Sequence, residues 1–166
     1  MHPAALPLAE LVTDCDIRRT RRGGPGGQHR NKVETAVVIT HRPTGVSGQA
    51  SERRSQDLNR QAAVQRLRVT LAVEVREPVD TDGTPSSLWR ARARGRQMTV
   101  SSEHGDFPAL LAEALDRLAA CDWDAGAAAE RLGVTASQLV KLLKLEPAAF
   151  QLLNRQRRAR ELTPLK

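Results

Sequence analysis

The sequence predicts an α+β protein: a small mixed domain with a β-hairpin sheet, a Gly-rich loop and one long helix, followed by an all-α helical module. Short β-branched segments separated by turn residues come first, an apolar pattern of helical period follows, and the last third is rich in Ala and Leu at helical spacing. We therefore expect a mixed domain over residues 1–77, a linker with a basic segment over 78–104, and the helical module over 105–166.

The predicted sheet lies within the first fifty residues. Residues 14–21 form a short strand that leads into the Gly-rich loop. A β-branched segment at 36–40 is followed by the turn residues Arg-Pro-Thr-Gly at 42–45, and an apolar segment at 46–50 comes next. Two strand-like segments on either side of such a turn predict a β-hairpin.

One long helix is expected after the hairpin. From Ser51 to about Ala72, apolar residues recur with the spacing of one helical face. Residues 69–75 also alternate with the two-residue period of a strand. We favour a helix here because no helix breaker occurs before Pro78. From Pro78 to Ser87, proline, glycine and serine are frequent and no apolar face is evident, which is typical of a linker.

Local signals divide the helical module into several helices. Asp106 is expected to cap a helix with a continuous apolar stripe. A short helix should end at Gly133, because glycine suits the position after a helix. Thr135 is expected to cap a helix that runs to Lys144, and Pro147 suits the first turn of another.

The same module has the apolar and glycine spacing of a helix-turn-helix. This spacing is common in Ala/Leu-rich helical hairpins, so DNA binding, RNA docking and a structural or protein-binding bundle all stay open. The segment from Arg155 to Lys166 is better suited to phosphate contact than the candidate recognition helix, which has only two basic residues. The residues expected to be exposed on that helix are Ser137, Gln138, Lys141 and Lys144.

Charge and composition indicate a polyanionic partner. The formal net charge is +7 and the pI is near 10.6, and aromatic residues make up 2% of the chain. Single-stranded bases usually stack on aromatic rings, so contact with phosphates and sugars is expected instead. The two cysteines and four histidines form no metal-ligand pattern, so we expect no metal and no cofactor.

Residues 23–28 read Gly-Gly-Pro-Gly-Gly-Gln. A phosphate-binding loop is disfavoured because Gly-Lys-Ser/Thr does not follow. A flexible turn between two strands is the other generic interpretation. The flanking residues favour a third one. Residues 24–32, 36–46, 54–56 and 59–60 together resemble the catalytic domain of class I peptide chain release factors, over about residues 14–75.

This resemblance implies that water attacks the ester bond that joins the nascent peptide to tRNA. In the family, the glycines of the GGQ motif shape the loop, and the backbone N–H of the glutamine stabilises charge on the ester oxygens. Gly26, Gly27 and Gln28 are therefore the expected catalytic residues. A glutamine side chain is no general base, so its expected task is to position water.

Polar residues around the motif are candidates for RNA contact. We favour ribosomal RNA as the partner of these residues. For the residues that directly follow the GGQ motif, the alternative is a solvated polar loop without an RNA contact. These are His29, Arg30, Asn31 and Lys32. A second group at the start of the long helix either holds the base of the loop or contacts RNA. Its members are Arg54, Gln56, Asn59 and Arg60.

The chain is closest in size to the short members of the family that rescue stalled ribosomes, because 166 residues leave no room for domains that read stop codons. We expect a peptidyl-tRNA hydrolase that is ribosome-dependent and codon-independent.

Its expected partners are large-subunit RNA at the peptidyl-transferase centre and peptidyl-tRNA. An accessory factor could contact the helical module. A monomer in the cytoplasm, or in an organelle matrix after removal of a transit peptide, is expected, without membrane association. The alternative is a non-catalytic regulatory protein that binds the ribosome or DNA.

Overall fold

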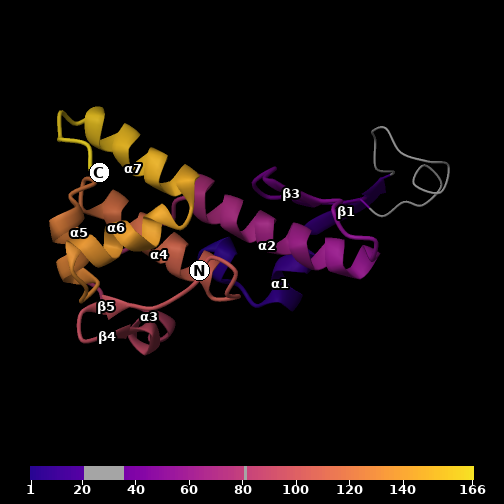
Figure 1. Ribbon diagram of the computed structural model, residues 1–166, viewed down its shortest axis with the longest axis horizontal. Coiled ribbons are helices and arrows are strands. Elements are labelled where there is room, and N and C mark those ends of the chain that lie inside the picture. Colours follow the sequence, from indigo (N-terminus) through magenta and orange to yellow (C-terminus); the bar gives the residue numbers. More distant parts are fainter. Residues whose placement is uncertain (21–35, 81) are drawn as a thin grey trace.

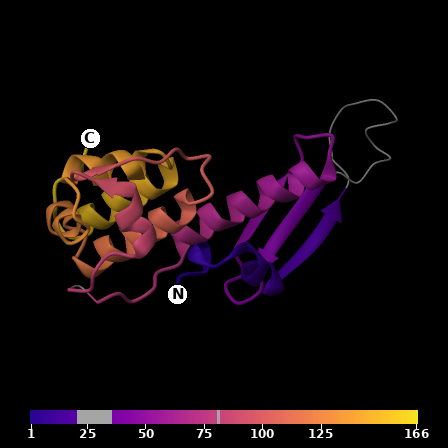
Figure 2. The same ribbon diagram turned by 90° about the horizontal axis from the view of Figure 1, so that it is seen from below.

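The computed structural model describes residues 1–20, 36–80 and 82–166. The fold is mixed α+β, as predicted. Figures 1 and 2 show an elongated molecule in which the sheet and the C-terminal helices lie towards opposite ends of helix α2. The elements, in chain order, are η1 (Pro3–Ala5), α1 (Leu8–Thr13), β1 (Cys15–Thr20), β2 (Ala36–His41), β3 (Ser47–Ala50), α2 (Gln56–Glu74), α3 (Ser87–Arg92), β4 (Ala93–Arg94), β5 (Gln97–Met98), α4 (Phe107–Ala120), α5 (Ala125–Arg131), α6 (Ala136–Lys144) and α7 (Pro147–Arg158).

Strands β1, β2 and β3 form an antiparallel sheet in that order, which confirms the predicted hairpin. The β2–β3 turn closes where the Gly45 N–H donates a hydrogen bond of 2.8 Å to the His41 carbonyl. Gly45 has a φ of 72°, which glycine adopts at little cost. Strand β1 lies at the edge of the sheet, and Cys15 is its only buried residue.

Helix α2 packs against β2 and β3 and connects the sheet to the other helices. The Ser55 hydroxyl caps it by accepting a hydrogen bond from the Leu58 N–H. The helix continues through residues 69–74, so the favoured interpretation of this ambiguous stretch is confirmed. Tertiary packing explains why this stretch is helical. Leu71 and Ala72 are fully buried, because the apolar face of α2 continues into the contact with η1 and α4.

The predicted helices of the C-terminal module are confirmed. Helix α5 ends just before Gly133, whose φ is 68°. The Thr135 hydroxyl accepts a hydrogen bond of 3.2 Å from the Gln138 N–H and so caps α6. Helix α6 ends at Lys144, and Pro147 occupies the first turn of α7.

Asp106 does not cap α4 as expected. It occupies the N-cap position, but its carboxylate accepts no hydrogen bond from the helix backbone. The carboxylate instead pairs with the Arg92 guanidinium at 2.6 Å. A charge-assisted bond of this kind is stronger than a neutral cap, and Arg92 comes close only after folding.

Residues 78–104 contain regular structure that the expected linker did not include, namely α3 and the hairpin β4–β5. Trp89 in α3 is fully buried, and its indole N–H donates a hydrogen bond of 2.8 Å to the Leu132 carbonyl. The Arg117 guanidinium of α4 donates to the Asp80 carbonyl. Much of the segment is therefore attached to the helical module.

One continuous hydrophobic cluster runs from the sheet through α2 into the helical module. The N-terminal segment, for which no structure was predicted, helps to close it. The Ala4 carbonyl accepts two hydrogen bonds from the Arg68 guanidinium at 2.9 and 3.1 Å. Just after α2, the Arg76 guanidinium donates to the buried Asp116 carboxylate at 3.0 Å. Buried contacts thus cross the boundary predicted between residues 77 and 78. No helix in the described part of the chain is long and apolar enough to span a bilayer.

Candidate active site

The predicted catalytic loop joins two strands whose register is defined. Thr20, the last residue of β1, pairs with Ala36, the first residue of β2. The two residues that flank segment 21–35 are therefore neighbours in adjacent strands, at one end of the sheet. The predicted site residues that lie outside the described residues are Gly26, Gly27, Gln28, His29, Arg30, Asn31 and Lys32.

The start of α2 lies at the same end of the sheet. Ala50, the last residue of β3, pairs with Val37, and α2 begins six residues later at Gln56. Figure 2 shows α2 running from this end back along the sheet towards the helical module. The topology therefore brings the second predicted group of site residues close to the strand ends that flank the loop segment.

Asn59 is a structural residue at this end and not a surface one. Its side chain is fully buried. Its amide nitrogen donates to the Arg53 carbonyl and its amide oxygen accepts from the Arg53 N–H, both at 2.9 Å. Because an asparagine side chain matches a peptide group in both directions, it can fix the connection between β3 and α2. Of the two roles weighed for Asn59, this geometry favours holding the structure near the loop base.

The other three predicted residues lie at or near the surface. Arg54 and Arg60 are exposed, and Gln56 is half-buried in the first turn of α2. Gln56 and Arg60 are four residues apart on the helix, so they share one face. Arg60 also lines an open groove of about 730 Å³ between α1 and α2. These positions permit contact with a large polyanion.

Two further arginines at this end were missed by sequence reasoning. Arg18 and Arg19 are both exposed, although they point to opposite faces of β1. Alternation along a strand predicts one buried face, and that signal fails here because α2 packs on β2 and β3 and leaves edge strand β1 uncovered. Together with Arg54 and Arg60 they give this end of the molecule a positive surface.

A nearby ion pair braces the connection between β3 and α2. The Arg66 guanidinium donates to both carboxylate oxygens of Glu52 and, at 2.7 Å, to the Gln49 carbonyl. The hydrogen bonds from Arg66 and from the Ser51 N–H lower the pKa of Glu52 to about 2. Glu52 is therefore an anion at neutral pH, and its charge is offset by Arg66.

The described residues place no acid–base pair at this end. His41, the nearest histidine among the described residues, lies at the opposite end of β2, and burial lowers its pKa. Its Nδ1 atom shares a hydrogen bond of 2.8 Å with the Thr44 hydroxyl. No group of His, Cys, Asp and Glu in the described ranges could hold a metal ion. The described geometry thus supports a loop and positions cationic side chains, and it supplies no proton-transfer group.

Comparison with known proteins identifies the family of this chain. A model of the RF-1 domain matches residues 11–102. This is more than half of the sequence, and the chain therefore belongs to the RF-1 domain family, to which the catalytic domains of class I peptide chain release factors belong. The match is longer than the expected 14–75, because it includes part of α1 as well as α3 and the hairpin β4–β5.

Several similar proteins are peptide chain release factors. The chain is 52% identical over 69 residues to the chloroplastic peptide chain release factor PrfB1 of Arabidopsis thaliana, which covers 42% of this chain and 15% of that protein. It is 50% identical over 74 residues to peptide chain release factor 1 of Caldicellulosiruptor saccharolyticus, a match that covers 41% of this chain and 21% of that protein. It is 37% identical over 105 residues to peptide chain release factor 1 of Rhodospirillum rubrum, a match that covers 60% of this chain and 27% of that protein. The chain thus spans about a quarter or less of these relatives.

Proposed function

We propose that this protein hydrolyses the ester bond of peptidyl-tRNA on the ribosome without reading a codon, and that it rescues stalled ribosomes. One observation carries the proposal. The RF-1 domain match covers the whole unit formed by β1, the loop segment, β2, β3 and α2. The named relatives act in peptide chain release, as their names state. Activity is therefore proposed for the unit that this chain shares with them.

The proposed catalytic residues are Gly26, Gly27 and Gln28. Glycines without a Cβ would let the loop backbone approach the 3′ end of tRNA closely. The Gln28 backbone N–H would donate to the oxygen that becomes negative as water attacks the ester carbon. The Gln28 side chain would orient that water. The Thr20–Ala36 pair supports this role, because it anchors the loop on two hydrogen-bonded strands.

The proposed binding partner is large-subunit RNA around the peptidyl-transferase centre. His29, Arg30, Asn31 and Lys32 are proposed to contact it beside the catalytic motif. The exposed arginines of the strand ends and of α2 support an RNA partner, because they would contact phosphates over a wider area. The protein would act wherever its ribosomes translate, in the cytoplasm or in an organelle. A monomer is sufficient for these contacts.

The test is release of labelled peptide from purified ribosomes with peptidyl-tRNA in the P site. Four complexes would be compared: an mRNA truncated at the P site, a stop codon in the A site, a sense codon in the A site, and isolated large subunits. Release from the truncated complex or from large subunits, but not from the sense-codon complex, is expected. Release only at stop codons would refute codon independence while leaving hydrolysis intact.

Gly27→Ala separates hydrolysis from binding. Under the proposal this variant loses peptide release by at least about a hundredfold, the usual effect of disturbing an oxyanion donor, and keeps its ribosome affinity. Gly105→Ala is the matched control, since a Cβ there meets no atom within 4 Å. Ribosome binding without release by the wild type would favour the alternative, a non-catalytic regulatory protein.

A further inference from the structure

The hairpin β4–β5 lies against the first turn of α6, and neither element takes part in the proposed catalytic unit. The Thr135 N–H, at the start of α6, donates a hydrogen bond of 3.1 Å to the Arg96 carbonyl. The Met98 N–H donates to the Gln138 side-chain oxygen at 3.3 Å. Gly95 and Arg96, at the tip of the hairpin, have φ values of 56° and 63°. The tip is therefore held in a defined position beside α6.

Unpaired basic side chains lie on both elements of this contact. Lys141 and Lys144 lie three residues apart on α6, Arg94 is the last residue of β4, and Arg96 lies at the tip of the hairpin. All four side chains are exposed. None of them forms a hydrogen bond or an ion pair with another described residue, although the Lys144 ammonium lies 5.3 Å from the centre of the Phe150 ring. We call these four residues the α6 basic face.

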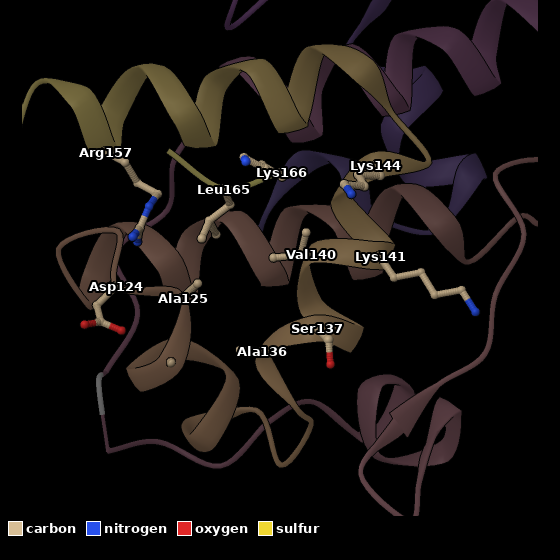
Figure 3. Close-up of a pocket in the computed structure, with 11 residues that line it drawn as sticks. Asp124, Ala125, Ala136, Ser137, Val140, Lys141, Lys144, Arg157, Leu165 and Lys166 are labelled. Carbon is tan, nitrogen blue, oxygen red and sulfur yellow. The ribbon is translucent and has the colours of Figure 1, made fainter. Parts of the chain in front are cut away.

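Lys141 and Lys144 also line a hollow. It has a volume of about 510 Å³ between α5, α6, α7 and the C-terminal residues. Figure 3 shows Lys141 and Lys144 on α6, with Lys166 and Arg157 coming from the other side. Asp124 is the acidic residue in the lining, and its carboxylate caps α5 through the Ala127 N–H. The positive surface thus continues around α6.

Lysines are concentrated around this hollow. The chain has only four lysines, and three of them line this hollow: Lys141, Lys144 and Lys166. Elsewhere its basic residues are almost all arginines, many of which are used in internal contacts. Arg157, for example, donates to the Trp123 carbonyl at 2.8 Å and to the Thr163 carbonyl at 2.9 Å. The three lysines in contrast form no hydrogen bond or ion pair with a described residue, although Lys144 contacts the Phe150 ring.

The chemistry of this face favours phosphates over bases. Trp89, Trp123 and Phe107 are buried, and Phe150 is half-buried beneath Lys144. No aromatic ring is therefore offered for stacking single-stranded bases. Insertion into a DNA major groove is also disfavoured. A helix-turn-helix inserts the N-terminal residues of its second helix, whereas here the hairpin holds the first turn of α6 and Gln138 is half-buried against it.

We propose that the α6 basic face binds the phosphate backbone of double-stranded RNA. A-form RNA has a wide, shallow minor groove and is recognised mainly by shape, through sugar and phosphate contacts. A helix flanked by a hairpin presents a broad cationic surface to such a duplex without entering a groove. The choice of RNA over DNA rests on the proposed ribosomal function. The surface would be a second RNA contact, remote from the Thr20–Ala36 end of the sheet (Figure 1).

The test is fluorescence anisotropy of the full chain with a labelled RNA duplex of about 16 base pairs, at several salt concentrations. Arg94→Ala/Lys141→Ala removes one charge from each part of the face. Arg155→Ala/Arg158→Ala removes the same charge from exposed positions on α7 and is the control, because that segment is the other candidate for phosphate contact. We expect the first variant to lose affinity at least about tenfold and the control less than about twofold. The slope of log K against log salt should fall by about 1.8 in the first variant, since each lost phosphate contact lowers it by roughly 0.9.

Three outcomes would overturn the inference: no binding by the wild type, equal losses in both variants, or tighter binding to a DNA duplex of the same sequence. Circular dichroism of both variants checks that the fold is intact. The peptide-release assay runs separately, so the two proposals can fail independently. If the protein releases peptide but the Arg94/Lys141 variant binds RNA as tightly as the wild type, the proposed hydrolysis stands and the proposed RNA site is refuted. If the protein binds RNA through this face but releases no peptide, the RNA site stands and the proposed hydrolysis is refuted.

Discussion

The packing of β3 against α2 depends on the absence of a side chain at Gly48. A Cβ placed there would lie 2.3 Å from the Ala63 carbonyl oxygen, 2.4 Å from the Leu67 nitrogen and 2.8 Å from the Leu67 Cα. All three are backbone atoms of α2, so no side-chain rotation can relieve the overlap. In Gly48→Ala the helix and the sheet must therefore move apart.

The cost of this change follows from general experience with overpacked cores. Added methyl groups in tight cores typically cost about 1–3 kcal/mol. We expect about 3 kcal/mol, because the contacts are with backbone atoms on a helix that is itself fixed by α4. For a chain of this size that corresponds to a fall in Tm of roughly 6–12 °C. Urea unfolding followed by circular dichroism would measure the first quantity and a thermal melt the second.

Two other glycine-to-alanine variants separate steric overlap from backbone strain. At Gly45 a Cβ meets no atom within 4 Å, but the φ of 72° disfavours alanine, so a loss of about 1 kcal/mol is expected. At Gly105 there is neither overlap nor an unusual φ, and the change should stay within about 0.5 kcal/mol. If Gly48→Ala were as stable as Gly105→Ala, the close approach of β3 to α2 would be refuted.

Three further predictions concern buried polar groups. Burial raises the pKa of Asp116 to about 6, against the opposing effects of the Glu77 N–H and the Arg76 guanidinium. Because this pKa lies above the ordinary value of 3.8, the favourable contribution of the group is complete below about pH 4 and is lost as pH rises through 6. Wild-type unfolding free energy should therefore fall by up to about 3 kcal/mol between pH 4 and 7 relative to Asp116→Asn, and parallel pH profiles for the two proteins would contradict this. Asn59→Ala should cost about 2–3 kcal/mol in urea unfolding, because the backbone N–H and C=O of Arg53 both lose their partner, and it should also slow peptide release; unchanged stability would show that the clamp is dispensable. Trp89→Phe removes the indole N–H that reaches the α5 end and should cost roughly 1–3 kcal/mol, whereas a loss below about 0.5 kcal/mol would mean that water replaces it.

Local chemistry explains which elements were predicted well. The turn at 42–45, the cap at Thr135 and the helix end at Gly133 each depend on residues close in sequence. The Gly-rich loop and its flanking motifs likewise indicate the family from sequence, and the RF-1 domain match confirms that resemblance. The individual roles proposed for Gly26, Gly27 and Gln28 stay predictions that the release assay addresses.

The elements that were missed depend on distant partners. Helix α3 was hidden in an expected linker, because its stability comes from Trp89 packing against the end of α5. The hairpin β4–β5 has a two-residue turn with an arginine at positive φ, which turn statistics do not suggest. Asp106 looked like a helix cap until folding brought Arg92 to it. In each case a residue far away in sequence, or a strained backbone held by its surroundings, decided the outcome.

The sequence by itself determined the family, the order of β1, β2, β3 and α2, and the location of the proposed chemistry in one loop. These follow from short-range turn, cap and motif signals, which survive without knowledge of the rest of the chain. Only the tertiary structure decided that Asn59 is a buried clamp, that edge strand β1 leaves Arg18 and Arg19 exposed, and that the hairpin β4–β5 meets α6 beside two lysines. The physical reason is that burial, and the grouping of charged side chains on a surface, depend on which segments meet in the folded protein. Met98 and Gln138, for example, are forty residues apart in sequence.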